Sequence, residues 1–119
     1  MNINLKGIHV DLDSDLEDYA TKRIEDVARL MNGDAESAVC DVEFLKDHAQ
    51  EKGEVFKVAV NLEVPGKVYR AEAVTESFEA SVDKVKDELW RELKSDKEKR
   101  ADSIRKGGAV AKEMLRGEQ

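Results

Sequence analysis

The 119-residue sequence contains a single cysteine, Cys40, so neither an internal disulfide framework nor a thiolate metal cage can form within one chain. No apolar run approaches the roughly 20 residues that a membrane helix needs. The opening residues, Met1 to Lys6, lack the apolar stretch of an export signal. We therefore expect neither export nor membrane insertion, and a cytoplasmic location.

Catalytic and cofactor signatures are also missing. His9 and His48 stand alone, without the paired spacing of a zinc site, and there is no glycine-rich phosphate loop or Gly-x-Ser-x-Gly elbow. Adjacent acidic pairs such as Asp87 and Glu88 point in different directions on a helix and form no carboxylate dyad. The sequence predicts no enzyme, no cofactor and no small-molecule substrate.

One acidic stretch resembles the start of a calcium loop, with carboxylates at alternate positions from Asp11 to Asp15. The sixth position of such a loop needs glycine and the twelfth needs glutamate, but Leu16 and Lys22 stand there. Helix capping accounts better for these residues, and no metal site is predicted.

Positive charge is scarce overall, since the formal net charge is −7. Residues 1–93 carry 12 Lys and Arg against 22 Asp and Glu, whereas residues 94–119 carry 8 against 5. Affinity for phosphate comes mainly from Lys and Arg, so the acidic bulk disfavours nucleic acid and the mildly basic end favours it.

What is present is a balance of 40% hydrophobic and 39% charged residues, which is typical of a packed core under a solvated surface. The length allows one core. Apolar residues alternate with period two from Met1 to Leu12, with one slip beside Gly7 that a bulge could absorb, so this segment is predicted to be a strand.

Helical spacing follows. Asp13 or Ser14 can cap a helix, with Ser14 and Glu17 in capping-box positions, and a left-handed cap is expected at Asn32-Gly33.

Period two returns at Ser37, where Cys40 shares a face with Val42 and Phe44 and is predicted to be a buried, inert thiol. A loop is expected over 46–54 and a strand over 56–64. Pro65-Gly66 suits a type II turn, so 67–74 should return as the last strand of a hairpin.

A second helix is predicted to start at a cap on Thr75 or Ser77, and its apolar stripe ends at Leu93. Residues 94–106 remain compatible with a helix that leaves the core and stops at Gly107-Gly108, and residues 109–119 are expected to fray. We expect a domain over 1–100 and a helical extension with a flexible tail over 101–119.

The predicted order is β-α-β-β-β-α. Each strand has one apolar face and each helix one apolar stripe, which indicates an α+β two-layer sandwich: a four-stranded sheet with two helices on one face. About 20 inward side chains, at roughly 1.5–3 kcal/mol each, would form the core without any cofactor.

Spaced cations are the remaining functional signal. Lys22 and Arg29 lie seven residues apart on the first helix, and Lys84 and Arg91 lie seven apart on the second. Two helical turns separate such side chains by about 10 Å, a spacing that can follow a phosphate backbone. The alternative is that neighbouring carboxylates pair with them in weak surface salt bridges.

Particular residues resemble the ribosome hibernation-promoting factor family, which includes protein Y. Residues 1–7 are similar to its first strand, and Leu16, Asp18-Tyr19 and Lys22-Arg23-Ile24 to its first helix. Ala71-Glu72, Phe78, Val82-Asp83, Asp87 and Leu89-Trp90-Arg91-Glu92-Leu93 resemble its fourth strand and second helix. The similarity covers about residues 1–100.

The resemblance implies a short family member that lodges in the small ribosomal subunit, in the channel for messenger and transfer RNA, and silences idle ribosomes. Both helices would face ribosomal RNA. By resemblance or by spacing, the expected RNA-contacting residues are Lys22, Arg23, Arg29, Lys84, Arg91, Lys94 and Lys97. Contacts of this kind go to phosphates and are salt-dependent.

A second hypothesis stays open. Glu79 stands where the family usually has an aromatic residue, and Glu88 where it usually has lysine. Together with the net charge of −10 over residues 1–93, these two residues leave room for a protein-binding adaptor of the same fold that has lost its RNA affinity.

Overall fold

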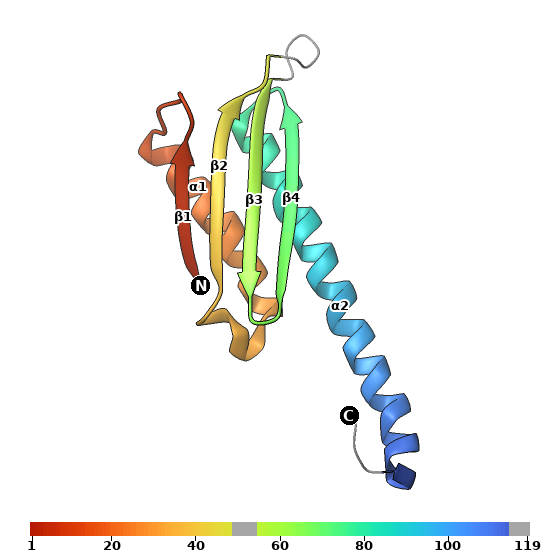
Figure 1. The fold of residues 1–119 in the computed structure, drawn as a ribbon. Helices are drawn as coiled ribbons and strands as arrows, with labels where there is room; N and C mark the ends of the chain where they lie inside the picture. The colour runs from red at the N-terminus through yellow and green to blue at the C-terminus, as the bar shows by residue number, and fades with distance from the viewer. Residues whose placement is uncertain (49–54, 115–119) are drawn as a thin grey trace.

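The computed structural model describes residues 1–48 and 55–114 of the chain, and it has the predicted two-layer architecture. Strands β1 (Asn2–Gly7), β2 (Val39–Lys46), β3 (Phe56–Val64) and β4 (Lys67–Thr75) lie in the sheet in that order. Helices α1 (Ser14–Glu25) and α2 (Phe78–Met114) lie on one face of the sheet (Figure 1). The α+β prediction is confirmed.

The pairing follows from the connections. β1 and β2 are parallel because α1 carries the chain back between them, and the other neighbouring strands are antiparallel. Gly66 has φ of 83°, as the third position of a type II turn requires, so the predicted hairpin turn is confirmed at that residue.

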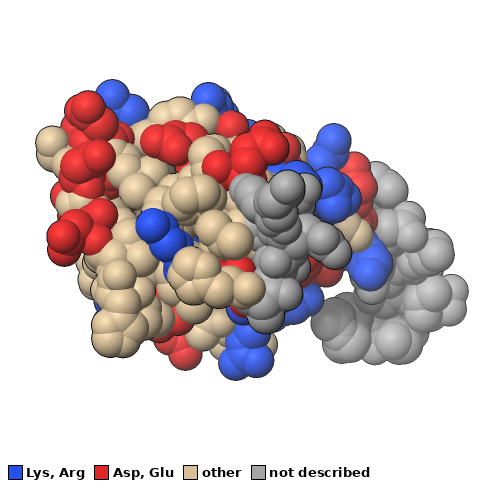
Figure 2. Space-filling model, turned by 90° about the horizontal axis from the view of Figure 1, so that it is seen from above, with Lys and Arg blue, Asp and Glu red and all other residues tan. Residues whose placement is uncertain are grey.

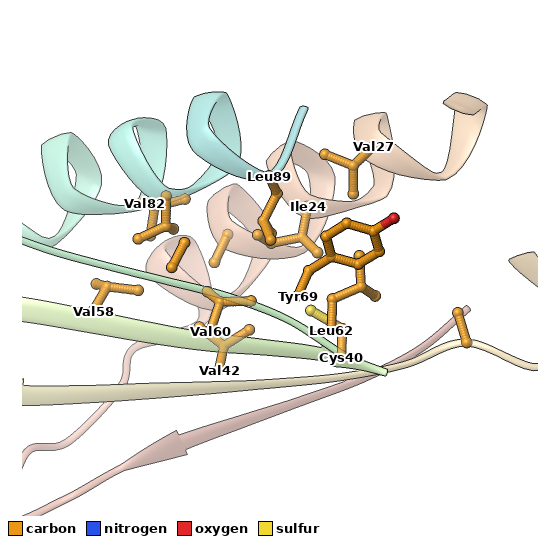
Figure 3. Packing of buried hydrophobic residues seen from close by; sticks show 14 of the residues in the cluster. Ile24, Val27, Cys40, Val42, Val58, Val60, Leu62, Tyr69, Val82 and Leu89 are labelled. Carbon is orange, nitrogen blue, oxygen red and sulfur yellow. The ribbon is translucent and has the colours of Figure 1, made fainter. Parts of the chain in front are cut away.

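The core lies between the sheet and the helices. Figure 3 shows Ile24 and Leu89 from the helices above Val60 and Leu62 from β3. Cys40 is fully buried, as predicted, and burial is the main cause that raises the pKa of its thiol to about 12. Such a thiol carries almost no thiolate at neutral pH and acts as a small apolar side chain.

The first strand is shorter than predicted. β1 ends at Gly7, and the chain turns there because the space that a side chain would fill is taken: a Cβ on Gly7 would lie 2.1 Å from the carbonyl oxygen of Val10. The break in the apolar alternation beside Gly7 therefore coincides with a close approach of the backbone at the end of the strand. The predicted bulge and the predicted continuation of the strand to Leu12 are wrong.

The first helix also differs in its ends. Asp13 is the N-cap, because its side chain accepts the backbone N–H of Leu16 at 2.8 Å, whereas Ser14 is already helical and forms no capping box. The α-helix ends at Glu25 and continues as two short 3-10 helices, η1 (Asp26–Leu30) and η2 (Asn32–Ala35). Gly33 does not have positive φ, so the left-handed cap is wrong.

Helix α2 begins as predicted, with the Ser77 hydroxyl oxygen accepting the N–H of Ala80 at 3.1 Å. It passes the predicted stop at Gly107-Gly108 and ends at Met114, so that prediction is wrong. Two glycines cost only about 2 kcal/mol of helix propensity, which does not by itself end a helix. Of the predicted loop over 46–54, residues 49–54 lie outside the described residues, as does the tail from 115.

The other face of the sheet is open and polar. A row of side chains crosses it from strand to strand, and its members pair with one another. Asn4 donates to Asp41 at 3.0 Å, and Arg70 donates to Asn61 at 3.1 Å. Because these groups already satisfy each other, the helical layer is the better candidate for a functional surface.

Candidate nucleic-acid interface

Helices α1 and α2 pack against each other along a seam. At one end of this seam, Asp83 of α2 contacts two side chains of α1. Its carboxylate accepts the Tyr19 hydroxyl at 2.8 and 2.9 Å, and it lies 3.3 Å from Nε of Arg23. The hydrogen bond to Asp83 is the main cause that raises the pKa of Tyr19. Arg23 also lies over the Tyr19 ring, 5.0 Å from its centroid. This predicted RNA contact is therefore tied across the seam by an acidic partner.

Further along the seam, Arg29 of η1 reaches α2. Its guanidinium lies 5.7 Å from the centroid of the Trp90 ring, and a second cation, Lys86, lies 5.6 Å from the same centroid. Lys86 was not among the predicted RNA-contacting residues, although it shares the Trp90 ring with Arg29. Its spacing of four residues from Trp90 could have indicated the pair, but Arg29 joins it only through the tertiary fold.

Lys84 and Arg91 lie on the other flank of α2, above β4. They line a shallow hollow there with Asp87, Glu88 and Glu72, so two cations share the hollow with three carboxylates. The predicted spacing along α2 is present, but this pair does not join the seam cations in one strip.

All seven predicted residues are exposed. Lys22 and Arg29 are not two turns apart on one helix, as predicted, because Lys22 lies in α1 and Arg29 in the tighter η1. Lys94 and Lys97 follow Leu93, the last buried residue among the described side chains of α2. Among the described residues, five of the seven form no ion pair: Lys22, Lys84, Arg91, Lys94 and Lys97.

Charge is mixed on the face that Figure 2 shows. Seen from above, acidic side chains lie at the left edge and along the top of the view, and Lys and Arg are dispersed among other residues. No single continuous basic patch is visible on that face. On this face the cations therefore occur singly or in small groups.

The part of α2 beyond the core is held against the hairpin turn. Asp96 accepts the Tyr69 hydroxyl at 2.7 Å and pairs with Lys67, which follows the turn directly. Hydrogen bonds from Lys67 first and Tyr69 second lower the pKa of the Asp96 carboxyl. The contact fixes the direction in which α2 leaves the core, and with it the position of the cations that follow Leu93.

Other kinds of site have little support. Within residues 1–48 and 55–114, no three His, Cys, Asp or Glu side chains gather in a way that could hold a metal ion. The same part of the chain has no helix with the length and apolar character to cross a membrane. The three aspartates from Asp11 to Asp15 supply the N-cap of α1 and two nearby charges.

Comparison with known proteins identifies the family. The family model described as Sigma 54 modulation protein / S30EA ribosomal protein matches residues 3–101. The chain belongs to this family. A ribosome hibernation promoting factor of Pseudomonas putida is 31% identical over 110 residues, which cover 92% of this chain and 99% of that protein. Family membership makes the protein a binding and regulatory factor rather than an enzyme.

Two solved structures share the fold of this chain. The N-terminal domain of Thermus thermophilus protein Y superposes with a TM-score of 0.67 at 22% identity and covers 80% of this chain and 98% of its own. A ribosomal subunit interface protein from Coxiella burnetii gives a TM-score of 0.66 at 20% identity and covers 82% and 98%.

Proposed function

We propose that this protein is a cytoplasmic ribosome hibernation factor that binds the small subunit in the channel for messenger and transfer RNA. The observation that carries the proposal is the match to a hibernation promoting factor over 99% of that protein's length. Residues 1–100 would form the ribosome-binding domain, and α2 from residue 101 to Met114 a helical extension of it.

The helical layer supplies the contacts in this proposal. The five predicted cations without an ion partner in the described residues lie on α1 and α2, so they are available to phosphates. Charged contacts of this kind hold a protein on RNA without reading its sequence. Each neutralised phosphate releases counterions, so binding should weaken steeply as salt rises.

Ribosome co-sedimentation across a salt series tests the proposal. The protein should pellet with small subunits at low salt, and excess messenger RNA should displace it. Changing Arg91 and Lys94 together to Glu should abolish pelleting. Lys6 and Arg70 lie on the open face of the sheet, so changing this pair to Glu gives the same net charge at a different place and should weaken pelleting much less. Equal loss in the two double variants would remove the helical surface from the proposal.

The adaptor function has one structural observation in its favour. Two of the seven predicted cations are paired with carboxylates: Arg23 with Asp83, and Arg29 with Asp26 at 3.5 Å. An adaptor would bind a protein partner and fail to pellet with ribosomes at every salt concentration, so the same salt series decides between the two functions.

A further inference from the structure

Trp90 is the only tryptophan of the chain, and it lies at the surface of the seam between α2 and η1. One part of the ring packs against the core, and the residue remains partly exposed. Cations from two elements lie over the ring, Arg29 at 5.7 Å and Lys86 at 5.6 Å from its centroid. An aromatic ring in contact with two cations is thus built into the helical layer.

Both cations are held only weakly by carboxylates. The Arg29 side chain is 71% exposed, and its partner Asp26 lies 3.5 Å away. Lys86, whose side chain is 21% exposed, lies 3.6 Å from the neighbouring Asp87, whose side chain is 64% exposed. The Arg29–Asp26 pair is exposed on both sides, and such pairs contribute about 0–1 kcal/mol, so a phosphate can replace the Asp26 carboxylate at small cost.

We propose that Trp90, Arg29 and Lys86 form a binding site for one unpaired nucleotide of RNA. The base stacks on the exposed part of the indole ring in place of the two cations that lie over it, and these cations move to the flanking phosphates. Proteins that bind single-stranded nucleic acid use this combination of an aromatic platform and a positively charged border. The inference rests on the proposed function and adds to it a contact with a base, which the phosphate contacts alone do not supply.

Because Trp90 is the single tryptophan, the intrinsic fluorescence of the protein reports on this site. In a titration with a 12-nucleotide oligo(U) at low salt, stacking should quench the fluorescence of Trp90. Replacing Trp90 with Ala should weaken binding to oligo(U) and to small subunits about 5- to 150-fold, which corresponds to roughly 1–3 kcal/mol per stacked base. Trp90→Phe should restore most of the affinity, because the phenyl ring still stacks.

A second variant leaves the core untouched. Arg29→Gln should lower the slope of log affinity against log salt for oligo(U) by about 0.7, the value for one phosphate on a single strand, whereas Trp90→Ala should leave the slope unchanged. Arg70→Gln and Val68→Ala are matched controls on the sheet, away from the seam, and should change neither affinity nor slope. Thermal unfolding of each variant confirms that it is folded.

The outcomes separate this site from the proposed function. If wild-type protein pellets with ribosomes and folded Trp90→Ala pellets equally well, the nucleotide site is refuted and the proposed function stands. Weaker pelleting of Trp90→Ala with no quenching by oligo(U) refutes base stacking and assigns Trp90 to a protein contact. If wild-type protein does not pellet at all, the proposed function fails, and the oligo(U) titration alone decides the nucleotide site.

Discussion

Replacing Asp83 with Asn tests whether the ion pair between Asp83 and Arg23 weakens RNA binding. The amide keeps the shape of the carboxylate but loses the charge that holds Tyr19 at 2.8 Å and Arg23 at 3.3 Å. A hydrogen bond to a charged group contributes about 1.5–3 kcal/mol when shielded from water. The Asp83 side chain is 46% exposed, so the interaction is screened, and we expect a loss of only about 1 kcal/mol of unfolding free energy.

Ribosome binding should change in the opposite direction. Without the Asp83 carboxylate, Arg23 is free to contact a phosphate, and one negative charge that repels the RNA backbone is gone. Recovery of up to about 1 kcal/mol corresponds to an affinity increase of roughly two- to fivefold at low salt. The assays are urea denaturation for stability and ribosome pelleting across a salt series for affinity.

Tyr19→Phe is the matched control, because it removes the hydroxyl and leaves both charges of the pair in place. It should lower stability by a similar amount and leave ribosome affinity unchanged. If Asp83→Asn weakens ribosome binding while remaining folded, Arg23 acts only when Asp83 positions it, and the idea that Asp83 restrains RNA binding is refuted.

Three further predictions concern the fold. Gly7→Ala should destabilise the protein by about 1–3 kcal/mol in urea, since its Cβ would overlap backbone, whereas Gly33→Ala, with open space around it, should be neutral or slightly stabilising; equal effects would contradict the close approach. The pKa of Asp96 is lowered in the folded state, so its stabilisation is present above about pH 4 and is lost as pH falls through the folded pKa. Wild type should therefore exceed Asp96→Asn by about 1 kcal/mol in urea at pH 6, and the difference should shrink as the pH is lowered below about 4. Cys40 should resist a thiol reagent at pH 8 and react fully in strong denaturant, and rapid labelling of folded protein would show that the thiol is not enclosed.

The sheet could be predicted from the sequence because strand patterns are local. β3 runs over Phe56–Val64 as predicted, since every second residue is apolar and Pro65-Gly66 ends the run. The end of β1 could not be predicted, because it depends on the approach of Val10 to Gly7, a contact that exists only once the chain has folded back.

The exposure of the seven predicted cations could be predicted from the sequence, but their arrangement and the place of Lys86 beside Trp90 could not. Exposure of the seven cations follows from their place opposite the apolar stripes. Their partners do not follow, because Asp83 meets Arg23 across 60 residues of sequence and Arg29 meets Trp90 across 61. The change from α-helix to η1 also rotated Arg29 away from the line of Lys22.

Net acidity and RNA binding are compatible in this fold because screening makes electrostatics local. At physiological salt the Debye length is about 8 Å, so exposed charges much further apart than this scarcely interact. Along α2, Lys84 and Lys97 are separated by 13 residues, or about 20 Å at the helical rise. Acidic residues at one end therefore cannot neutralise cations at the other. Affinity for RNA should depend on the carboxylates next to each cation, Asp83 above all, rather than on the formal charge of −7.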